Sequence, residues 1–212
     1  GNTTSMCNLG IYYRDVEKDY LMMKKYFVMS ATNGDSNAFF NLGLYYQNVE
    51  SNYPVMKKYY ELGISKQNAN SMFHLAHYYL SVENNLELAI KYYLMAVEAG
   101  VDAIVISNHG GRVLDCTPGV CEVIPAIAKA VKGKITILAD GGVRTGVDVV
   151  KMIGLGADAV LIGRPFVTAS FGGKTDGVKT YVENIKNELK STMILTGCQS
   201  IKDIDSKVIY NY

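Results

Sequence analysis

The chain has 212 residues, and its 21 basic and 20 acidic side chains leave a formal net charge of +1 at pH 7. A balance this close to neutral creates no long-range field for nucleic acid or an anionic membrane, so we predict neither as a partner. No apolar run is long enough to cross a membrane, and residues 1–5 lack the basic and apolar regions of a signal peptide. We therefore expect a soluble, cytoplasmic protein.

Cysteine usage predicts no metal centre. The four cysteines are scattered and lack the paired spacing of metal ligands; they are Cys7, Cys116, Cys121 and Cys198. Although Cys116 and Cys121 lie close together in the sequence, we expect free thiols and no bound metal.

Composition divides the chain into two parts. Thirteen of the 16 tyrosines precede residue 98, whereas 15 of the 20 glycines lie at or after Gly100. This change predicts a domain over residues 1–98 and a second domain over residues 99–212.

Sequence motifs recur every 33 residues in the first domain. The segment Asn8–Tyr13 returns at 41–46 and again at 74–79, and a motif of lysine followed by tyrosine keeps the same offset. A period of this size is typical of stacked helix pairs, and the apolar positions within each unit follow helical spacing. We predict three helical hairpins.

These motifs resemble tetratricopeptide repeats and, most closely, the Sel-one-like repeats with their Leu-Gly-x-Tyr-Tyr and Lys-x-Tyr-Tyr signatures. The resemblance covers about residues 3 to 98 and implies a stacked array whose concave face binds a protein or peptide. In the alternative interpretation, the tyrosines and small residues only pack neighbouring repeats together. His74 and His77 lie one helical turn apart, and we predict a packing or surface role for both.

Short apolar runs alternate with helical patterns in the second domain. The sequence predicts strands at 102–107, 135–139 and 159–162, helices at 119–131 and 146–155, and further helical segments to about residue 195. Strands that alternate with helices predict βαβ units and a parallel sheet.

Three polar or glycine-rich motifs directly follow these strands: Ser107-Asn108-His109-Gly110-Gly111-Arg112, Asp140-Gly141-Gly142-Val143-Arg144 and Gly163-Arg164-Pro165. An imidazole that is neutral near pH 7 suits proton abstraction, and the planar fork of an arginine suits a carboxylate. In the other two motifs, small residues leave the backbone amides accessible to a ligand. Together with two arginines and the N-terminus of the following helix, those amides favour a phosphate group.

In their order and spacing these motifs resemble the C-terminal part of the FMN-dependent 2-hydroxy-acid oxidases and dehydrogenases, such as glycolate oxidase and lactate oxidase. The resemblance runs from about residue 96 to residue 204 and implies strands six to eight of an eight-stranded (β/α) barrel. The expected fold class is α+α/β: an N-terminal α-solenoid of about three helical hairpins followed by a partial (β/α)8 barrel.

The resemblance also implies a role for each motif. His109 is expected to be the catalytic base that takes a proton from the 2-hydroxy acid, and Arg112 to bind the substrate carboxylate. FMN is the expected cofactor, held by Ser107, Asp140, Gly141, Gly142, Val143, Arg144, Gly163 and Arg164. The alternative for the two glycine-rich motifs is a pair of ordinary tight turns that carry surface arginines.

Strands one to five of the family's barrel have no counterpart in this sequence. The resemblance places there the aspartate that orients the catalytic base, so we expect one chain to be incomplete as a catalyst. The open sheet edges favour association into a homo-oligomer or with another barrel fragment.

Two functions are consistent with the sequence. The first is an FMN-binding oxidoreductase that acts on a small 2-hydroxy acid such as lactate or glycolate. The alternative is a helical-repeat interaction scaffold fused to a catalytically inactive flavin- or phosphate-binding barrel fragment.

Overall fold

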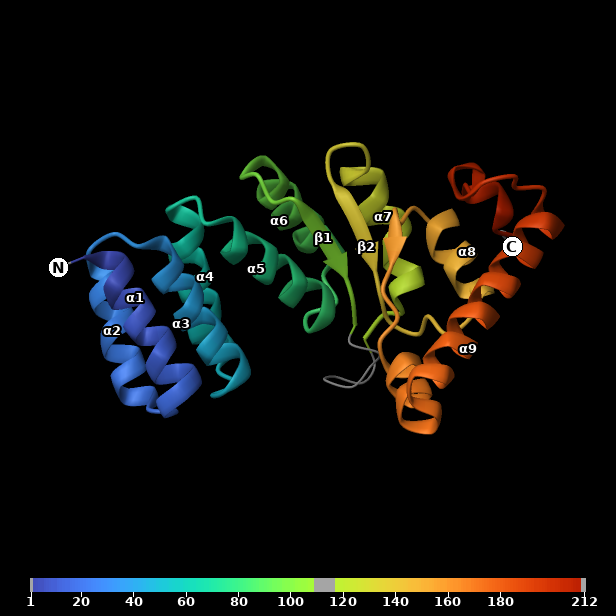
Figure 1. Cartoon of the computed structure of the whole chain (residues 1–212). Coiled ribbons are helices and arrows are strands. Elements are labelled where there is room, and N and C mark those ends of the chain that lie inside the picture. The colour runs from blue at the N-terminus through green and yellow to red at the C-terminus, as the bar shows by residue number, and fades with distance from the viewer. Residues whose placement is uncertain (1, 109–116, 211–212) are drawn as a thin grey trace. The chain divides into compact units, whose positions relative to one another are not determined.

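The computed structural model describes residues 2–108 and 117–210, coloured along the chain in Figure 1. The chain divides into two compact units. The first comprises residues 1–79 and 87–101, and the second comprises residues 80–86 and 102–212. Of the expected site residues, His109 and Arg112 lie outside the described residues.

The first unit is helical. Its elements are α1 (Thr3–Tyr12), the π-helical turn η1 (Tyr13–Glu17), α2 (Tyr20–Thr32), α3 (Ser36–Asn48), α4 (Tyr53–Ser65), α5 (Ala69–Ser81) and α6 (Leu86–Glu98). Polar side chains accept hydrogen bonds from first-turn amides of α1 to α4, the caps being Asn2, Asp19, Asp35 and Asn52. The predicted helices are therefore present, while their stacking into a solenoid stays a prediction.

The glycine of the Leu-Gly motif lies where two helices approach closely. A Cβ atom on Gly10 would lie 2.5 Å from the Phe27 ring, and one on Gly43 would lie 2.3 Å from the Tyr60 ring. Both rings are fully buried. Larger residues at these two positions would displace an aromatic side chain from the core.

Tyrosine pairs join consecutive helices of the first unit at the same offset of 33 residues. Their ring centroids lie 5.4, 5.4 and 5.5 Å apart and their planes are within 10° of parallel, in the pairs Tyr13–Tyr26, Tyr46–Tyr59 and Tyr79–Tyr92. Such stacking contributes to stability beyond the area that it buries. This geometry supports a packing role for these tyrosines.

His74 packs among aromatic rings in the first unit. Its ring centroid lies 5.0 Å from that of Phe40 and 6.1 Å from that of Tyr60. Burial, aided by the nearby charge of His77, lowers the pKa of His74 from its ordinary 6.5 to about 4.

This burial predicts acid sensitivity. Between pH 6.5 and 4 the unfolded chain binds a proton at His74 that the folded chain does not, so stability falls as pH falls through this range. The lowered pKa of His74 changes the free energy of unfolding by about 3 kcal/mol in total, because each pKa unit corresponds to about 1.4 kcal/mol. We expect His74→Asn, which introduces the residue found 33 positions earlier, to reduce this pH dependence in denaturant titrations at pH 7, 5.5 and 4. If the free energy of unfolding depended on pH equally in the two proteins, the prediction would be wrong.

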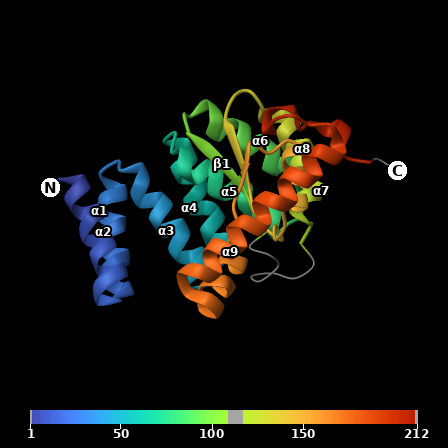
Figure 2. The same cartoon turned by 45° about the vertical axis from the view of Figure 1, so that its right-hand side comes forward.

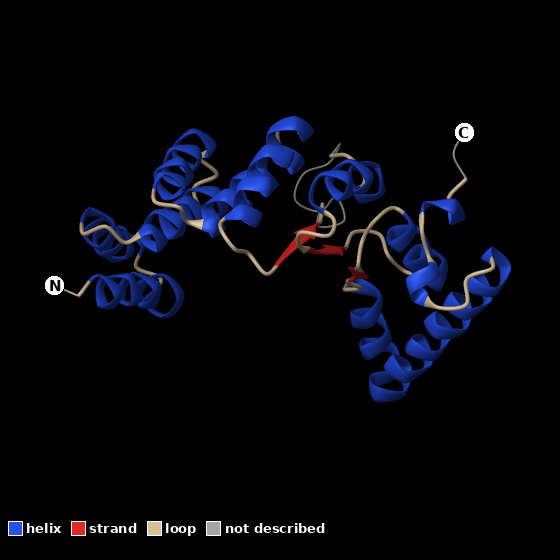
Figure 3. Ribbon diagram, turned by 90° about the horizontal axis from the view of Figure 1, so that it is seen from above, coloured by secondary structure: helices blue, strands red, loops and turns tan. Residues whose placement is uncertain are grey.

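The second unit contains a three-stranded parallel sheet in the order β1-β2-β3, drawn red in Figure 3. Its elements are β1 (Ala103–Ile106), α7 (Val120–Val131), β2 (Thr136–Ala139), α8 (Gly146–Gly154), β3 (Ala159–Val160) and α9 (Arg164–Thr196), followed by the short 3-10 helices η3 (Ile201–Asp203) and η4 (Ser206–Val208) of the C-terminal segment. Ile104 is aligned with Ile137, and Leu138 with Ala159. The arrangement is consistent with a partial α/β barrel and confirms the predicted βαβ pattern, although the strands are shorter than the sequence predicts.

The core of this unit is formed by the strands and by the inner face of α7. Its fully buried large side chains are Ile104, Ile106, Ile124, Ile127 and Ile137. A second cluster attaches the C-terminal segment to α8 through Val150, Cys198 and Ile204.

Helix α9 packs directly against the beginning of α8, as Figures 1 and 2 show. A Cβ atom on Gly146 would lie only 2.2 Å from the backbone nitrogen of Leu189. Lys174, with φ 48° and ψ −133°, breaks the helical geometry within α9. This kink separates a short helical segment at the end of β3 from the long segment that contacts α8.

Candidate functional site

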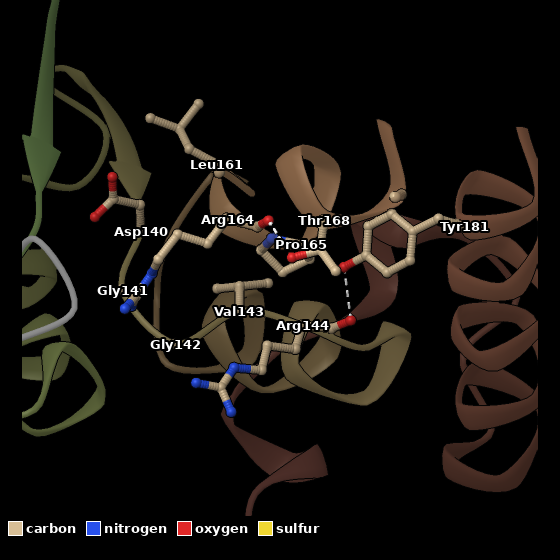
Figure 4. Close-up of a pocket in the computed structure, with 12 residues that line it drawn as sticks. Asp140, Gly141, Gly142, Val143, Arg144, Leu161, Arg164, Pro165, Thr168 and Tyr181 are labelled. Carbon is tan, nitrogen blue, oxygen red and sulfur yellow. Dashed lines mark hydrogen bonds between the residues drawn. The ribbon is translucent and has the colours of Figure 1, made fainter. Parts of the chain in front are cut away.

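A cavity of about 750 Å³ lies in the second unit, at the ends of β2 and β3 (Figure 4). Its lining includes the expected cofactor residues Asp140, Gly141, Gly142, Val143, Arg144, Gly163 and Arg164. The parallel register brings these two loops together, because the carboxyl ends of adjacent parallel strands share one edge of the sheet.

The loop after β2 is shaped by two glycines. Gly141 has φ +102° and Gly142 has φ +86°, in the region that residues with a side chain rarely adopt. A Cβ atom on Gly141 would also lie 2.6 Å from Oδ1 of Asn108. The backbone can therefore turn into the cavity only with glycine at this position.

Asp140 begins this loop and carries an unsatisfied acceptor. Its backbone amide donates to the carbonyl of Ile106 at 3.0 Å, which extends the β1–β2 pairing by one residue. Its Oδ1 atom is buried and accepts no hydrogen bond from the described residues. A buried carboxylate oxygen of this kind requires a donor, which a hydroxyl group of a bound molecule could provide.

The N-terminus of α8 is occupied by carboxylates of the protein. The amides of Arg144 and Thr145 donate to Oδ2 of Asp148 at 3.1 and 3.0 Å, and the amide of Gly146 donates to Oε2 of Glu188 at 2.8 Å. These three amides are therefore bonded to acidic side chains of the protein, and binding of an anion at this helix N-terminus stays a prediction.

Four other amides remain for an anion. Within residues 2–108 and 117–210, the N–H groups of Gly142, Val143, Gly163 and Arg164 donate to no protein acceptor. They belong to the two loops that line the same cavity. Backbone amides that converge on a cavity can bind an anion, so these four are candidates for such a role.

Two arginines add positive charge to this cavity. Arg144 and Arg164 are both exposed, and neither forms an ion pair with a carboxylate in the described part of the chain. Figure 4 shows the Arg164 side chain extending from the start of α9 towards Gly141. An unpaired guanidinium next to bare amides suits a phosphate group.

Tyr181 is a lining residue that the sequence motifs did not indicate. Its hydroxyl donates to the carbonyl oxygen of Arg144 at 2.8 Å, and its ring packs edge-on against Phe166 with centroids 5.0 Å apart. Burial raises the pKa of Tyr181, and the charges of Glu188 and Asp148 raise it further. The phenol therefore remains a donor and connects α9 to the glycine-rich loop. No sequence signal marks it, because it lies in a polar helical stretch.

The remaining expected site residues are Ser107, His109 and Arg112. Ser107 is buried directly after β1, whereas His109 and Arg112 lie outside the described residues, so their roles stay predictions. No cluster of three or more potential metal ligands occurs among the described residues. In the same ranges no helix is both long and apolar enough to span a membrane.

A parallel βαβ sheet with a cavity after two adjacent strands is consistent with part of an α/β barrel. A family model described as FMN-dependent dehydrogenase matches residues 88–211, more than half of the chain. The chain belongs to this family, and FMN is the family's cofactor.

Curated relatives match the same part of the chain. Peroxisomal (S)-2-hydroxyacid oxidase GLO4 of Arabidopsis thaliana is 53% identical over 111 residues, which are 52% of this chain and 31% of the relative. L-lactate dehydrogenase of Pseudomonas aeruginosa (strain LESB58) is 52% identical over 111 residues, 52% of this chain and 29% of the relative. The chain thus spans about a third of the length of these proteins.

Solved structures give the same result. A mandelate oxidase crystal structure is 42% identical, with a TM-score of 0.51, and the match covers 53% of this chain and 33% of that protein. A flavocytochrome b2 variant is 35% identical, with a TM-score of 0.53, over 56% of this chain and 32% of that protein.

The Tyr181 contacts predict a measurable effect on the second unit. Tyr181→Phe keeps the ring but removes the hydrogen bond to Arg144, so we expect the free energy of unfolding to fall by about 0.5–1 kcal/mol in urea titrations. Tyr181→Leu also removes the contact with Phe166 and is expected to cost more. An unchanged unfolding midpoint in Tyr181→Phe would show that this bond does not stabilise the loop.

Proposed function

We propose that residues 99–212 form the phosphate-binding side of the FMN site in a 2-hydroxy-acid oxidase or dehydrogenase. The observation that carries this proposal is that one cavity is lined by the residues of four unbonded amides, by two unpaired arginines and by Asp140 with its orphaned Oδ1. These are the groups that a phosphate ester with a polyhydroxyl chain requires.

FMN fits this donor set in two places. Its phosphate suits the amides of Gly142, Val143, Gly163 and Arg164, with the guanidinium groups of Arg144 and Arg164 balancing its charge. A ribityl hydroxyl suits Oδ1 of Asp140, which would then gain its missing donor. Ser107 is proposed to contact the flavin.

The proposed roles of the substrate-binding residues are based on the sequence motif at 107–112. We assign His109 as the base that removes a proton from the 2-hydroxy acid, and Arg112 as the group that binds its carboxylate. When bound, FMN supplies the acceptor for the two electrons that leave the substrate. Lactate and glycolate are the substrates that the family membership favours.

The second side of the site is proposed to come from another barrel region. In the described residues β1 and β3 each pair only with β2, so both sheet edges are open. Open edges favour pairing with further strands. A second copy or a separate barrel fragment is the proposed partner, and together they would complete the catalyst.

Residues 1–98 are proposed to form a separate interaction domain, a stacked array of tetratricopeptide or Sel-one-like hairpins that binds a protein or peptide. The tyrosine pairs and close helix contacts at intervals of 33 residues support this part of the proposal. If the barrel part proves catalytically inactive, the chain would act as an interaction scaffold with a flavin-binding fragment.

Flavin titration tests the proposed site. We expect FMN to bind more tightly than riboflavin, which lacks the phosphate, and Arg164→Met to raise the Kd for FMN about 10- to 100-fold. This corresponds to about 1.5–3 kcal/mol for a charged hydrogen bond. Lys190→Met, which removes a positive charge farther along α9, is the matched control and should leave the Kd unchanged. Equal affinity for FMN and riboflavin would contradict the proposed phosphate site.

Anaerobic reduction of the FMN-loaded protein tests the substrate end. Lactate or glycolate should bleach the flavin absorption, and His109→Ala should slow bleaching about 100- to 10,000-fold, because a general base contributes this much to a proton transfer. Arg112→Lys should raise the substrate concentration that gives half of the maximal bleaching rate, since lysine cannot bind a carboxylate with two parallel hydrogen bonds. Equal bleaching rates with and without His109 would rule out its role as base, and no bleaching at all would show that self-association alone does not complete the catalyst.

A further inference from the structure

The outward face of α1 differs from the matching faces of α3 and α5. Leu9 and Tyr12 of α1 are 41% and 44% exposed. The residues 33 and 66 positions later are buried, with exposed fractions of 1% for Leu42, 6% for Tyr45, 0% for Leu75 and 5% for Tyr78. The same side chains are therefore covered in two of the three hairpins and uncovered in the first.

The second helix of the preceding hairpin covers these buried tyrosines. Tyr20 of α2 lies 5.3 Å from Tyr45, measured between ring centroids, and Tyr53 of α4 lies 5.3 Å from Tyr78. A lysine one turn after each covering tyrosine lies over the same ring: Lys24 Nζ is 4.6 Å from the centroid of Tyr45, and Lys57 Nζ is 5.6 Å from that of Tyr78.

A glutamate completes the contact between α2 and α3. The Tyr45 hydroxyl donates to Oε1 of Glu50 at 2.7 Å, and Lys24 Nζ lies 2.5 Å from the same oxygen. Lys24 is therefore held both by the carboxylate and by the tyrosine face.

The first hairpin contains a tyrosine and a glutamate that correspond to Tyr45 and Glu50. The Tyr12 hydroxyl donates to Oε1 of Glu17 at 2.5 Å, and both residues stand 33 positions before Tyr45 and Glu50. In the described residues no lysine or arginine lies over the Tyr12 ring or pairs with Glu17. The face formed by Leu9, Tyr12 and Glu17, here called the α1 face, thus has an aromatic surface and a carboxylate ready for a cation.

We propose that the α1 face is a docking site for a further helical hairpin of the same repeat type. Its second helix would carry tyrosine, methionine, lysine and an aromatic residue at positions i, i+3, i+4 and i+7. The helices α2 and α4 have this pattern in Tyr20, Met23, Lys24 and Phe27, and in Tyr53, Met56, Lys57 and Tyr60. The inference rests on the proposed repeat organisation and is independent of the flavin site.

Charge favours such a hairpin over a second copy of α1. Two α1 faces packed together would place two Glu17 carboxylates in one interface and would supply no lysine to either. The second helix of a hairpin instead brings one lysine for each glutamate, as Lys24 does for Glu50.

An extended chain tests this docking site. The sequence of residues 36–68 is inserted directly before Thr3, so that the inserted Asn68 takes the place of Asn2 as the cap of α1. We expect amide hydrogen exchange in α1 to slow by at least about 10-fold, because the inserted helix should cover Leu9 and Tyr12.

Charge variants test which partner the α1 face selects. Lys57→Glu within the inserted copy places a carboxylate against Glu17 and should remove most of the added protection. Glu17→Lys combined with this variant should restore the protection, which a merely structural effect of the insertion would not do.

Three results would overturn the proposal: equal exchange in the extended and original chains, equal protection by the Lys57→Glu insert, or a dimer of the original chain that already protects α1. Flavin affinity is measured on the same proteins and should not change. A failure of the docking site is thus distinguishable from a failure of the proposed FMN site.

Discussion

The parallel pairing of β2 between β1 and β3 is the constraint on which the candidate site depends. It places the ends of β2 and β3 side by side, so that the glycine-rich loop and the start of α9 line one cavity. The amide of Asp140 extends the β1 pairing, and the amide of Leu161 donates to Ala139 at 2.8 Å to extend the β3 pairing. Both loops therefore leave the sheet from fixed positions.

The backbone amides near the cavity fall into two groups: those bonded to carboxylates of the protein and those without a protein acceptor in the described residues. The carboxylate of Asp148 accepts from the amide of Arg144 before α8, and that of Glu188 in α9 accepts from the first amide of α8, which links the two helices. The loop amides of Gly142, Val143 and Gly163 have no acceptor among the described residues, and Tyr181 bonds to a carbonyl of the loop rather than to an amide. These loop amides therefore remain for the proposed phosphate, whereas those bonded to Asp148 and Glu188 do not.

The helical unit relies on a different principle, in which aromatic packing repeats at a fixed interval. The absence of a side chain at Gly10 and Gly43 leaves room for the rings of Phe27 and Tyr60 in the core, and stacked tyrosines join consecutive helices. Tyr20 and Tyr53 cover the tyrosines of the helices that follow them, whereas Leu9 and Tyr12 of α1 are exposed. The repeat pattern explains why this surface differs from the matching surfaces of α3 and α5.

The sequence by itself determined the helices of the first unit, the strand and helix order of the second, and the loops that meet at the cavity, because these follow from local periodicity and motif spacing. Only the tertiary structure decided that Tyr181 supports the loop, that Glu188 bonds to the start of α8, and that Oδ1 of Asp140 lacks a donor. Contacts such as that between Tyr181 and Arg144 join residues 37 positions apart, and neither residue's neighbours in the sequence specify the other. Their geometry is set by the packing of α9 on α8, which no local pattern encodes.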